Sequence, residues 1–262
     1  MTRTATVTIV RHGETSYNHA GIIQGHLDTP LNDQGEAQAR WTGKWFALQG
    51  VHFDEAWTSD LQRAKRTAGL ILESQKEPVT LQQDERIRER FLGNLQGKRR
   101  GDPGTDPSTV EPIPQLRARL WSFWDELFPS PSPSSSSTSS ITSSSAAAEE
   151  KPKQILYVSH GAAIREFIRS VVEEAATSSG SRAGQRDGEW EVALPEEEAE
   201  MLRSGSKRID NCSRTVVEVE EVEGSGTGAP YYHFRLTLYA DDSHFDESSR
   251  APSPTANADV VE

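Results

Sequence analysis

Two short segments, far apart in the chain, share one pattern. Residues 8–13 read TIVRHG and residues 156–161 read LYVSHG, so each apolar run ends in a polar residue, a histidine and a glycine. Such runs are typical of buried strands, and the glycine permits a sharp turn where the strand ends. If the two strands are neighbours, His12 and His160 face one crevice at the carboxyl edge of a sheet. The pair therefore predicts both a parallel sheet and a site at its edge.

Segments typical of strands and of helices alternate along the rest of the chain. Amphipathic helices are expected after a cap at Asn32 and after a cap at Ser59 or Asp60, each followed by an apolar stripe. The other expected elements are strands over 6–10, 53–58 and 155–158, helices over 117–128 and 162–175, and two antiparallel strands over 215–219 and 231–239. This order predicts an α/β fold of three layers (αβα), in which a mostly parallel central sheet carries helices on both faces.

The apolar residues are distributed unevenly. They make up only 34% of the 262 residues, because residues 130–145 are almost wholly Ser, Pro and Thr and the end of the chain is polar and acidic. Such segments bury too little apolar surface to offset the entropy lost on ordering. We therefore expect one domain over residues 1–240, interrupted by a disordered insertion at 129–152 and followed by a disordered acidic tail over 241–262.

Charge and composition exclude several classes of protein. The net charge of −12 argues against general nucleic-acid binding, which needs a basic surface. The single cysteine, Cys212, excludes an intrachain disulfide. No stretch is apolar for long enough to span a bilayer, so we expect no membrane partner and a location in the cytoplasm or the nucleus. The sequence has no HExxH, no Cys/His knuckle and no dense Asp cluster, so no metal site is expected.

Two arginines accompany the histidine pair. Arg11 precedes His12, and Arg63 lies one turn into the helix that follows the second strand. A single His-Gly is most often structural, and a single arginine is most often a solvated cation. However, an arginine in the first turn of a helix opposes the helix dipole unless it reaches an anion bound there. The combination favours an anion site, and a phosphate suits the planar fork of arginine donors.

Four motifs occur in a fixed order: RHGET, SDLxRAxxTA, a Glu-Arg-x-x-Gly segment and a late SHG. Together they resemble the histidine phosphatase superfamily, the phosphoglycerate mutase-like proteins, over residues 6–213. Within it, IIQGHLDTPLNDQGEAQA and LGNLQGKRR are most similar to the small-molecule phosphatases, nearest to the TIGAR-type fructose-bisphosphatases. The sequence departs mildly from the TIGAR-type Leu-Arg-Glu-Arg pattern, with Ile87 in place of the leucine.

The resemblance implies a catalytic set of five residues. His12 would be the nucleophile, held by a backbone carbonyl at its other ring nitrogen, because a neutral imidazole attacks phosphorus without adding negative charge. Glu89 would protonate the leaving group. Arg11, Arg63 and His160 would surround the phosphate, with His160 contributing most as imidazolium. No metal or organic cofactor is implied, because arginine and histidine supply the positive charge that Mg²⁺ supplies elsewhere.

A second set is expected to bind the substrate. Its members are Thr15, Asn18, Gln24, Gly25, Arg90, Arg100 and Gly161. For Thr15 and Asn18 the alternative is turn chemistry after the strand. For the basic residues around position 100 the alternative is a solvated loop.

The preferred interpretation is a phosphatase that hydrolyses a small phosphorylated metabolite, such as the sugar bisphosphate fructose 2,6-bisphosphate, through a phosphohistidine. A cofactor-dependent phosphoglycerate mutase is the first alternative, since it uses the same chemistry. The segment after Gly97 departs from the mutase pattern, which favours hydrolysis. A non-catalytic regulatory or binding module on the same fold is the second alternative, and it is disfavoured because all five residues of the catalytic set are present. No heptad or surface patch in the sequence encodes an oligomeric state.

Overall fold

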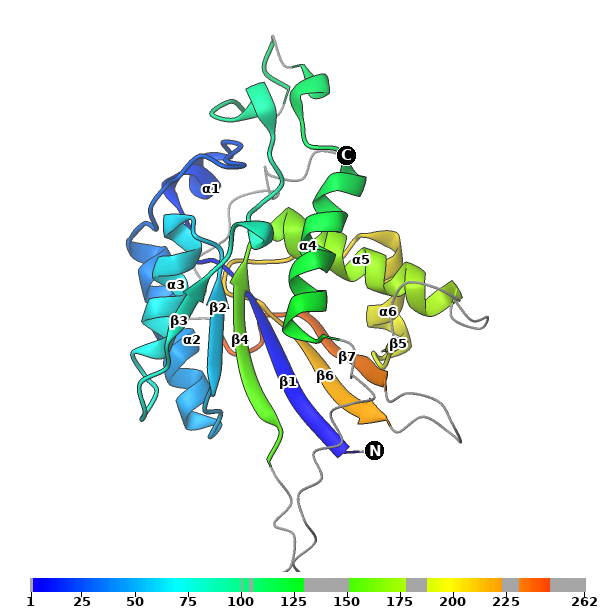
Figure 1. Ribbon diagram of the computed structural model, residues 1–262. Helices are drawn as coiled ribbons and strands as arrows, with labels where there is room; N and C mark the ends of the chain where they lie inside the picture. The colour runs from blue at the N-terminus through cyan, green and yellow to red at the C-terminus, as the bar shows by residue number, and fades with distance from the viewer. Residues whose placement is uncertain are drawn as a thin grey trace, which may run out of the picture.

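The protein is described by a computed structural model that covers residues 2–99, 101–103, 106–129, 151–177, 188–222 and 231–245. In this part of the chain one seven-stranded sheet has the order β3-β2-β4-β1-β6-β7-β5 (Figure 1). The strands are β1 Thr2–Arg11, β2 Glu55–Thr58, β3 Leu81–Gln83, β4 Lys153–Ser159, β5 Gly188–Val192, β6 Arg214–Val222 and β7 Tyr231–Asp241. Neighbouring strands are parallel except where β6 pairs with β1 and β7. The sheet is mostly parallel, as predicted, and the antiparallel pair near the end of the chain is confirmed.

Helices cover both faces of this sheet, which confirms the three-layer prediction. The α-helices are α1 Ser16–Ala20, α2 Asp33–Leu48, α3 Gln62–Leu72, α4 Ile113–Leu127, α5 Gly161–Thr177 and α6 Glu196–Ser204. The short 3₁₀ helices are η1 Glu85–Ile87, η2 Gly93–Leu95 and η3 Pro107–Thr109. In Figure 1, α2 and α3 lie on one side of the strands, and α4 and α5 lie on the other.

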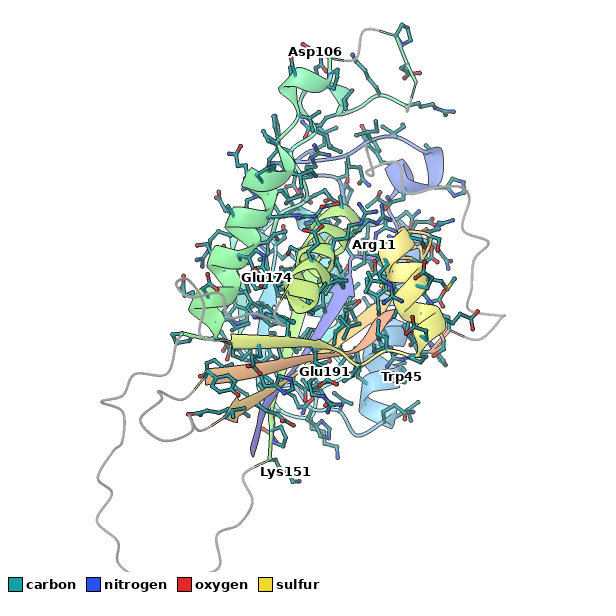
Figure 2. The ribbon with its side chains drawn as sticks, turned by 90° about the vertical axis from the view of Figure 1, so that its right-hand side faces the viewer. Arg11, Trp45, Asp106, Lys151, Glu174 and Glu191 are labelled. Carbon is teal, nitrogen blue, oxygen red and sulfur yellow. The ribbon has the colours of Figure 1, made fainter. Side chains whose placement is uncertain are left out.

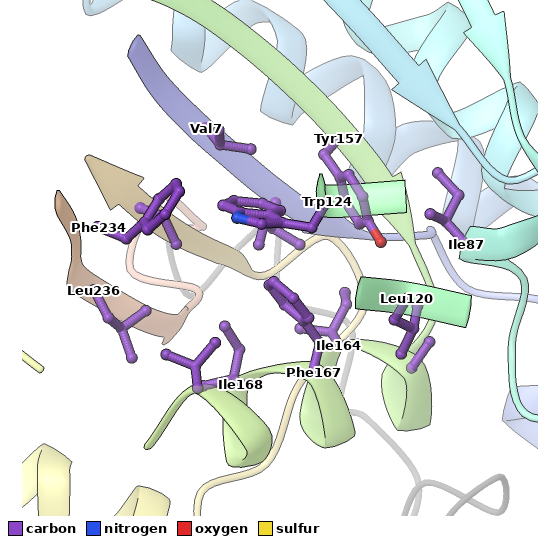
Figure 3. Packing of buried hydrophobic residues seen from close by; sticks show 14 of the residues in the cluster. Val7, Ile87, Leu120, Trp124, Tyr157, Ile164, Phe167, Ile168, Phe234 and Leu236 are labelled. Atoms are coloured by element: carbon purple, nitrogen blue, oxygen red, sulfur yellow. The ribbon is translucent and has the colours of Figure 1, made fainter. Parts of the chain in front are cut away.

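The larger core lies between the sheet and the helices α4 and α5. Val7 and Ile9 of β1 pack there with Trp124 of α4 and Phe167 of α5 (Figure 3). Aromatic rings fill much of this space, and the rings of Trp190 and Phe234 stack with centroids 4.6 Å apart. Because large rings bury much apolar area, this layer contributes strongly to the stability of the sheet.

The opposite face of the same strands forms the second core, against α2 and α3. Val10 of β1 and the β4 residues Leu156 and Val158 pack there with Phe46 and Ala64. Successive side chains of a strand point to opposite faces, so a strand with both faces covered is apolar at nearly every position. This is why the run LYV has no charged or small polar residue, whereas in β1 the buried Thr6 and Thr8 alternate with Val7 and Ile9.

Helix α2 begins as the sequence predicts, whereas α3 does not. The Asn32 side chain accepts a hydrogen bond from the Gly35 amide and caps α2. For α3 the capping position is Leu61, which has no side-chain cap bond, so the expected cap at Ser59 or Asp60 is wrong. Asp60 instead forms an ion pair with Arg88, which takes its carboxylate away from the helix end.

Four of the strands and α-helices were not expected from the sequence: α1, β3, β5 and α6. Strand β5 overlaps residues 176–189, which are rich in Gly and Ser. Helix α6 starts in the acidic run at residues 196–198, where glutamates favour a helix N-terminus because they oppose its positive dipole end.

The expected domain boundaries fall partly outside the described residues. Most of the expected insertion at 129–152 lies outside them, as do residues 246–262 of the expected tail. The domain extends beyond residue 240, however. Asp241 ends β7, and His244 and Phe245 are buried against α2, where the Trp41 indole donates to the His244 carbonyl at 2.7 Å. Within the described ranges, no helix combines the length and apolarity that crossing a membrane requires.

Candidate active site

The two predicted histidines lie at the carboxyl ends of β1 and β4, which are parallel neighbours. Arg11 pairs with Ser159 in the strand register, and the His12 amide donates to the Ser159 carbonyl at 2.9 Å. The imidazole rings of His12 and His160 are fully buried, with centroids 5.2 Å apart. The fold therefore brings the two histidines together at the edge where parallel sheets bind ligands.

The ring of His12 is held in one orientation. Its Nδ1 lies 2.7 Å from the Gly13 carbonyl oxygen, and because a carbonyl only accepts, Nδ1 carries the proton. Nε2 then holds the lone pair and has no hydrogen-bond partner among the described residues. Burial, followed by the charges of Arg63 and Arg11, lowers the pKa of His12 well below 6.5. His12 is thus a neutral imidazole at pH 7 with Nε2 available for attack.

His160 is also neutral in this structure. Burial lowers its pKa well below 6.5, and the charge of Arg63 and the neighbouring His12 lower it further. Neither of its ring nitrogens has a hydrogen-bond partner in the part of the chain that the structure describes. The expected imidazolium form is therefore disfavoured here, and the negative charge of a bound phosphate would be needed to favour it.

Two buried arginines flank the histidines. Arg11 lies in the interior of the molecule at the end of β1, and its Nη1 donates to the Ile209 carbonyl at 2.7 Å (Figure 2). Arg63 lies in the first turn of α3 and is fully buried, and its two Nη atoms donate to the carbonyls of Gly25 and Leu27 at 2.7 Å. A buried guanidinium in the first turn of a helix places positive charge where an anion is favoured.

The carboxylate of Glu89 lies at the N-terminus of α5, directly after His160. Its Oε2 accepts from the Ala162 amide at 3.1 Å, and its Oε1 accepts from the amides of Ala163 and Arg90 at 2.9 and 2.8 Å. The side chain is fully buried. Glu89 is therefore placed by the helix that the second His-Gly motif begins.

The loop after His12 contains turn chemistry. Thr15 caps α1 by accepting from the Asn18 amide at 3.0 Å, and the Asn18 side chain accepts from the Thr15 amide at 3.2 Å. The Thr15 hydroxyl also donates to Oε1 of the buried Gln24 at 2.9 Å. The alternative considered for Thr15 and Asn18 is therefore present, and their contact with substrate stays a prediction.

Gly25 holds a position that few other residues could occupy. Its φ of +53° is in the left-handed region, and an added Cβ would lie 2.3 Å from the Gln96 side chain. Because its carbonyl accepts from Arg63, this turn fixes the guanidinium.

The remaining predicted substrate residues are placed differently. Gly161 is buried and begins α5. Arg90 is half-buried, and its Nε donates to the Glu111 carbonyl at 2.8 Å, so it helps to hold a loop. Arg100 lies outside the described residues.

Several residues that the sequence did not single out support the His12 loop. The Thr67 hydroxyl accepts from the Gly13 amide at 2.9 Å, and the Asn211 side chain donates to the His12 carbonyl at 2.8 Å. Gly35 packs so closely on this loop that an added Cβ would lie 2.0 Å from the Glu14 carbonyl oxygen. Thr67 lies within the SDLxRAxxTA motif, which was a usable signal, whereas nothing in the single sequence distinguishes Asn211.

In the described ranges, no group of three or more His, Cys, Asp or Glu residues is arranged to hold a metal ion.

Comparison with known proteins decides the family. The sequence pattern of the "Histidine phosphatase superfamily (branch 1)" matches residues 7–202. The chain belongs to the histidine phosphatase superfamily. Solved structures agree with the fold: Bacillus stearothermophilus YhfR is 21% identical, with a TM-score of 0.61 over 92% of this chain and 99% of that one. A Bacillus anthracis phosphoglycerate mutase is 21% identical, with a TM-score of 0.59 over 93% and 96%.

Curated relatives of this chain share higher identity over shorter stretches. The broad-specificity phosphatase YOR283W of Saccharomyces cerevisiae is 41% identical over 90 residues, which are 34% of this chain and 39% of that protein. The fructose-2,6-bisphosphatase TIGAR of Xenopus tropicalis is 39% identical over 136 residues, which are 46% and 49%. TIGAR B of Danio rerio is 34% identical over 197 residues, which are 65% and 76%. The chain thus spans less than half the length of the first two relatives.

Proposed function

We propose that this histidine phosphatase hydrolyses a small phosphorylated metabolite through a phosphohistidine formed on His12. The observation that carries the proposal is the state of His12. Its Nδ1 is fixed on the Gly13 carbonyl, and its pKa is lowered by burial and by Arg63 and Arg11. Its Nε2 is therefore an unprotonated nucleophile set among cationic groups, as transfer of a phosphoryl dianion requires.

In the first half-reaction, His12 Nε2 attacks phosphorus, the P–N bond forms and the bond to the ester oxygen breaks. Arg11 and Arg63 stabilise charge on the phosphoryl oxygens, because their guanidinium groups need no reorganisation at the moment of transfer. The departing alkoxide takes a proton from Glu89. For this step Glu89 must be in its acid form, which the negative charge of the bound phosphate favours and the amides of Ala162 and Ala163 oppose.

In the second half-reaction, water attacks the phosphorus of the phosphohistidine. The P–N bond breaks, inorganic phosphate leaves, and Glu89 takes a proton from the attacking water, which returns the enzyme to its initial state. Glu89 therefore acts as acid and then as base, as microscopic reversibility requires.

The proposed substrate class is a small phosphate ester, with a sugar bisphosphate as the leading candidate. Support comes from the relatives that are named as fructose-2,6-bisphosphatases and as a broad-specificity phosphatase. A second phosphate would need cationic partners near the first, for which Arg90 and Arg100 were expected. The Nε of Arg90 is bonded to the Glu111 carbonyl. The proposal of a second phosphate is therefore supported by the named relatives and not by Arg90.

Phosphoglycerate mutase activity is the second candidate. A mutase of Xanthobacter autotrophicus is 37% identical over 97 residues, which are 37% of this chain and 47% of that protein. A mutase must shield its phosphohistidine from water and return the phosphoryl group to a second hydroxyl, whereas a phosphatase admits water.

The test is a panel of phosphate esters assayed for phosphate release, with His12→Ala as the matched variant. We expect wild type to release phosphate from p-nitrophenyl phosphate and from at least one sugar bisphosphate, and to carry acid-labile phosphate on His12. Isomerisation of 3-phosphoglycerate, with and without 2,3-bisphosphoglycerate, separates the mutase. Equal rates for wild type and His12→Ala on every ester would end the enzymatic proposal and favour a non-catalytic binding module.

A further inference from the structure

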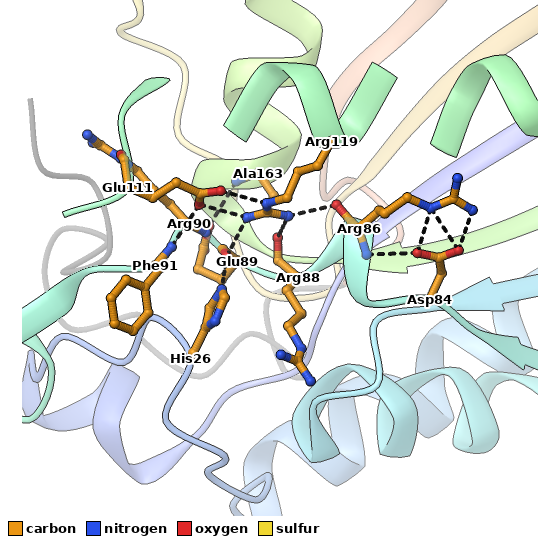
Figure 4. Close-up of polar contacts among 10 residues, drawn as sticks. All are labelled: His26, Asp84, Arg86, Arg88, Glu89, Arg90, Phe91, Glu111, Arg119 and Ala163. Atoms are coloured by element: carbon orange, nitrogen blue, oxygen red, sulfur yellow. Dashed lines mark hydrogen bonds and ion pairs between the residues drawn. The ribbon is translucent and has the colours of Figure 1, made fainter. Parts of the chain in front are cut away.

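Arg119 in α4 uses all five N–H donors of its guanidinium group in hydrogen bonds to Glu111 and to the backbone of residues 86–89 (Figure 4). Its Nε and Nη2 donate to the two carboxylate oxygens of Glu111 at 2.8 and 2.9 Å. Its Nη1 donates to the carbonyls of Arg86 and Arg88, and its Nη2 also donates to the Glu89 carbonyl, each at 2.7 Å. Three carbonyls of one short segment therefore converge on a single cation.

The segment that Arg119 holds has little regular structure of its own. Helix η1 ends at Ile87, and the next residues belong to no helix or strand until η2 begins at Gly93. Backbone carbonyls outside ladders and helices need other partners when they are buried. Arg119 supplies partners for the carbonyls of residues 86, 88 and 89, while the Ser159 hydroxyl donates to the Ile87 carbonyl at 2.8 Å. One side chain of a distant helix thus binds three of the four carbonyls of residues 86–89.

Glu111 fixes Arg119 and the far side of the same segment. Burial alone would raise the pKa of Glu111, but the hydrogen bonds and charge of Arg119 outweigh it and lower the pKa. The Glu111 carboxylate also accepts from the Phe91 amide at 3.0 Å, and the Glu111 amide donates to the Phe91 carbonyl at 2.8 Å. The Arg119–Glu111 pair thus binds backbone groups before and after residue 89.

Glu89 is consequently bound at both its carboxylate and its backbone carbonyl. The amides of Ala162 and Ala163 bind its carboxylate, while Arg119 and the His26 ring, whose Nε2 is 2.7 Å from the Glu89 carbonyl, bind its backbone. Moving the backbone would pull the carboxyl group away from the helix end that orients it.

We propose that Arg119, held by Glu111, is a positioning residue that places the Glu89 carboxyl group for proton transfer to the leaving group. The inference rests on the proposed function, in which Glu89 is the acid. Lysine at position 119 keeps the charge but has three donors and no planar fork, so it would leave carbonyls of this segment unpaired. The expected defect is therefore a displaced Glu89 carboxyl group, and it slows only the hydrolysis of esters whose leaving group needs a proton.

The experiment compares kcat/KM on two esters for wild type, Arg119→Lys and Arg117→Lys. Departure of the p-nitrophenolate from p-nitrophenyl phosphate needs little help from an acid, whereas the alkoxide of β-glycerophosphate needs a proton. Since acid catalysis contributes about 10²–10⁴-fold and a displacement of about 1 Å can cost about 10²-fold, we expect Arg119→Lys to lose about 10–100-fold on β-glycerophosphate. We expect the loss on p-nitrophenyl phosphate to be less than about 3-fold, because the nucleophile and the phosphate pocket are unchanged.

Arg117→Lys is the matched control. Arg117 lies in the same helix, but its Nη atoms bind Glu173 and Glu166 of α5, away from residue 89. We expect this variant to keep the wild-type ratio between the two esters. If Arg119→Lys does not fold, Glu111→Gln replaces it, since it weakens the same pair with little change in volume, and the same selective loss is expected.

Equal losses of Arg119→Lys on both esters, or no loss on β-glycerophosphate, would overturn the inference. Adding Arg119→Lys to Glu89→Gln should cost less than about 2-fold more on β-glycerophosphate, because residues that act as a unit are not additive. If Glu89→Gln itself loses nothing on β-glycerophosphate, the proposed role of Glu89 fails. If Glu89→Gln loses activity and Arg119→Lys does not, only the positioning inference fails.

Discussion

The rings of His12 and His160 lie with centroids 5.2 Å apart, although the two residues belong to opposite halves of the chain. Parallel pairing of β1 with β4 produces this proximity, and the hydrogen bond from the His12 amide to the Ser159 carbonyl fixes the two strand ends together. Burial, and then the charge of Arg63, lowers the pKa of each ring. Two neutral imidazoles beside a buried guanidinium form a site for which a dianion would be the complementary ligand.

Glu89→Gln should retain phosphate binding and lose turnover on esters with poor leaving groups. Glutamine has similar volume but no acidic proton, so we expect about 10²-fold or more lower kcat/KM on β-glycerophosphate. Inhibition by inorganic phosphate should change little. The control is Glu85→Gln in the same segment, since the Glu85 side chain is 74% exposed and contacts only Arg88 at 3.4 Å among the ion pairs of the described residues. Hydrolysis of β-glycerophosphate at the wild-type rate by Glu89→Gln would remove this residue from the mechanism.

Arg63→Lys should weaken anion binding. The two Nη atoms of Arg63 span the carbonyls of Gly25 and Leu27, and an ammonium reaches only part of this arrangement. Loss of a hydrogen bond to a charged group costs about 1.5–3 kcal/mol, so the inhibition constant of orthovanadate should rise by about 10-fold or more. Arg66→Lys, in the same helix but exposed in a pair with Glu36, should leave the constant unchanged. A similar rise in both variants would point to a general change of α3.

Gly35→Ala should displace the His12 loop. An added Cβ would lie 2.0 Å from the Glu14 carbonyl oxygen and 2.6 Å from the Glu14 amide nitrogen, so backbone must move. We expect a loss of about 1–3 kcal/mol in the free energy of unfolding and a larger relative fall in kcat. Gly69→Ala is the control, because no atom lies within 4 Å of its added Cβ and helical alanine is favoured by about 0.5–1 kcal/mol. Chemical denaturation and p-nitrophenyl phosphate turnover measure both effects, and wild-type behaviour of Gly35→Ala would contradict the close packing.

Stability should fall as the pH drops from 7.5 to 5. Burial, and then the charge of Arg214, lowers the pKa of His244 to about 4 in the folded protein, against 6.5 when unfolded. Below pH 6.5 the unfolded chain binds a proton that the folded chain does not, so the free energy of unfolding falls by about 2 kcal/mol at pH 5 from this residue alone. His12 and His160 act with the same sign.

Denaturant unfolding of wild type and His244→Gln across this range checks the prediction. Glutamine can still donate to the Thr42 hydroxyl, which lies 3.1 Å from His244 Nε2. We expect the variant to lose less stability than wild type between pH 7.5 and 5. Parallel curves for the two proteins would show that His244 is not the group that titrates.

The local pattern of the sequence was sufficient for the central strands, for α2 and for the two histidines. Buried parallel strands are apolar at nearly every position, and a glycine must follow where the chain turns at their carboxyl ends, so TIVRHG and LYVSHG carry their structure within a few residues. The cap of α2 at Asn32 is equally local. In contrast, β5 and α6 depend on packing against Phe234 and the rest of the core, which no short window of sequence contains.

The sequence by itself determined which reactive side chains lie at the ends of the strands and helices. The neighbours of a residue along a strand or a helix turn are fixed by the backbone period. Only the tertiary structure decided how the parts act together. It set the 5.2 Å separation of the two rings, the lowered pKa of both histidines and the hydrogen bond from Arg119 to the Glu89 carbonyl. Burial and long-range hydrogen bonds control these properties, and both arise from residues that are remote in the chain and meet only when the sheet and its helices pack.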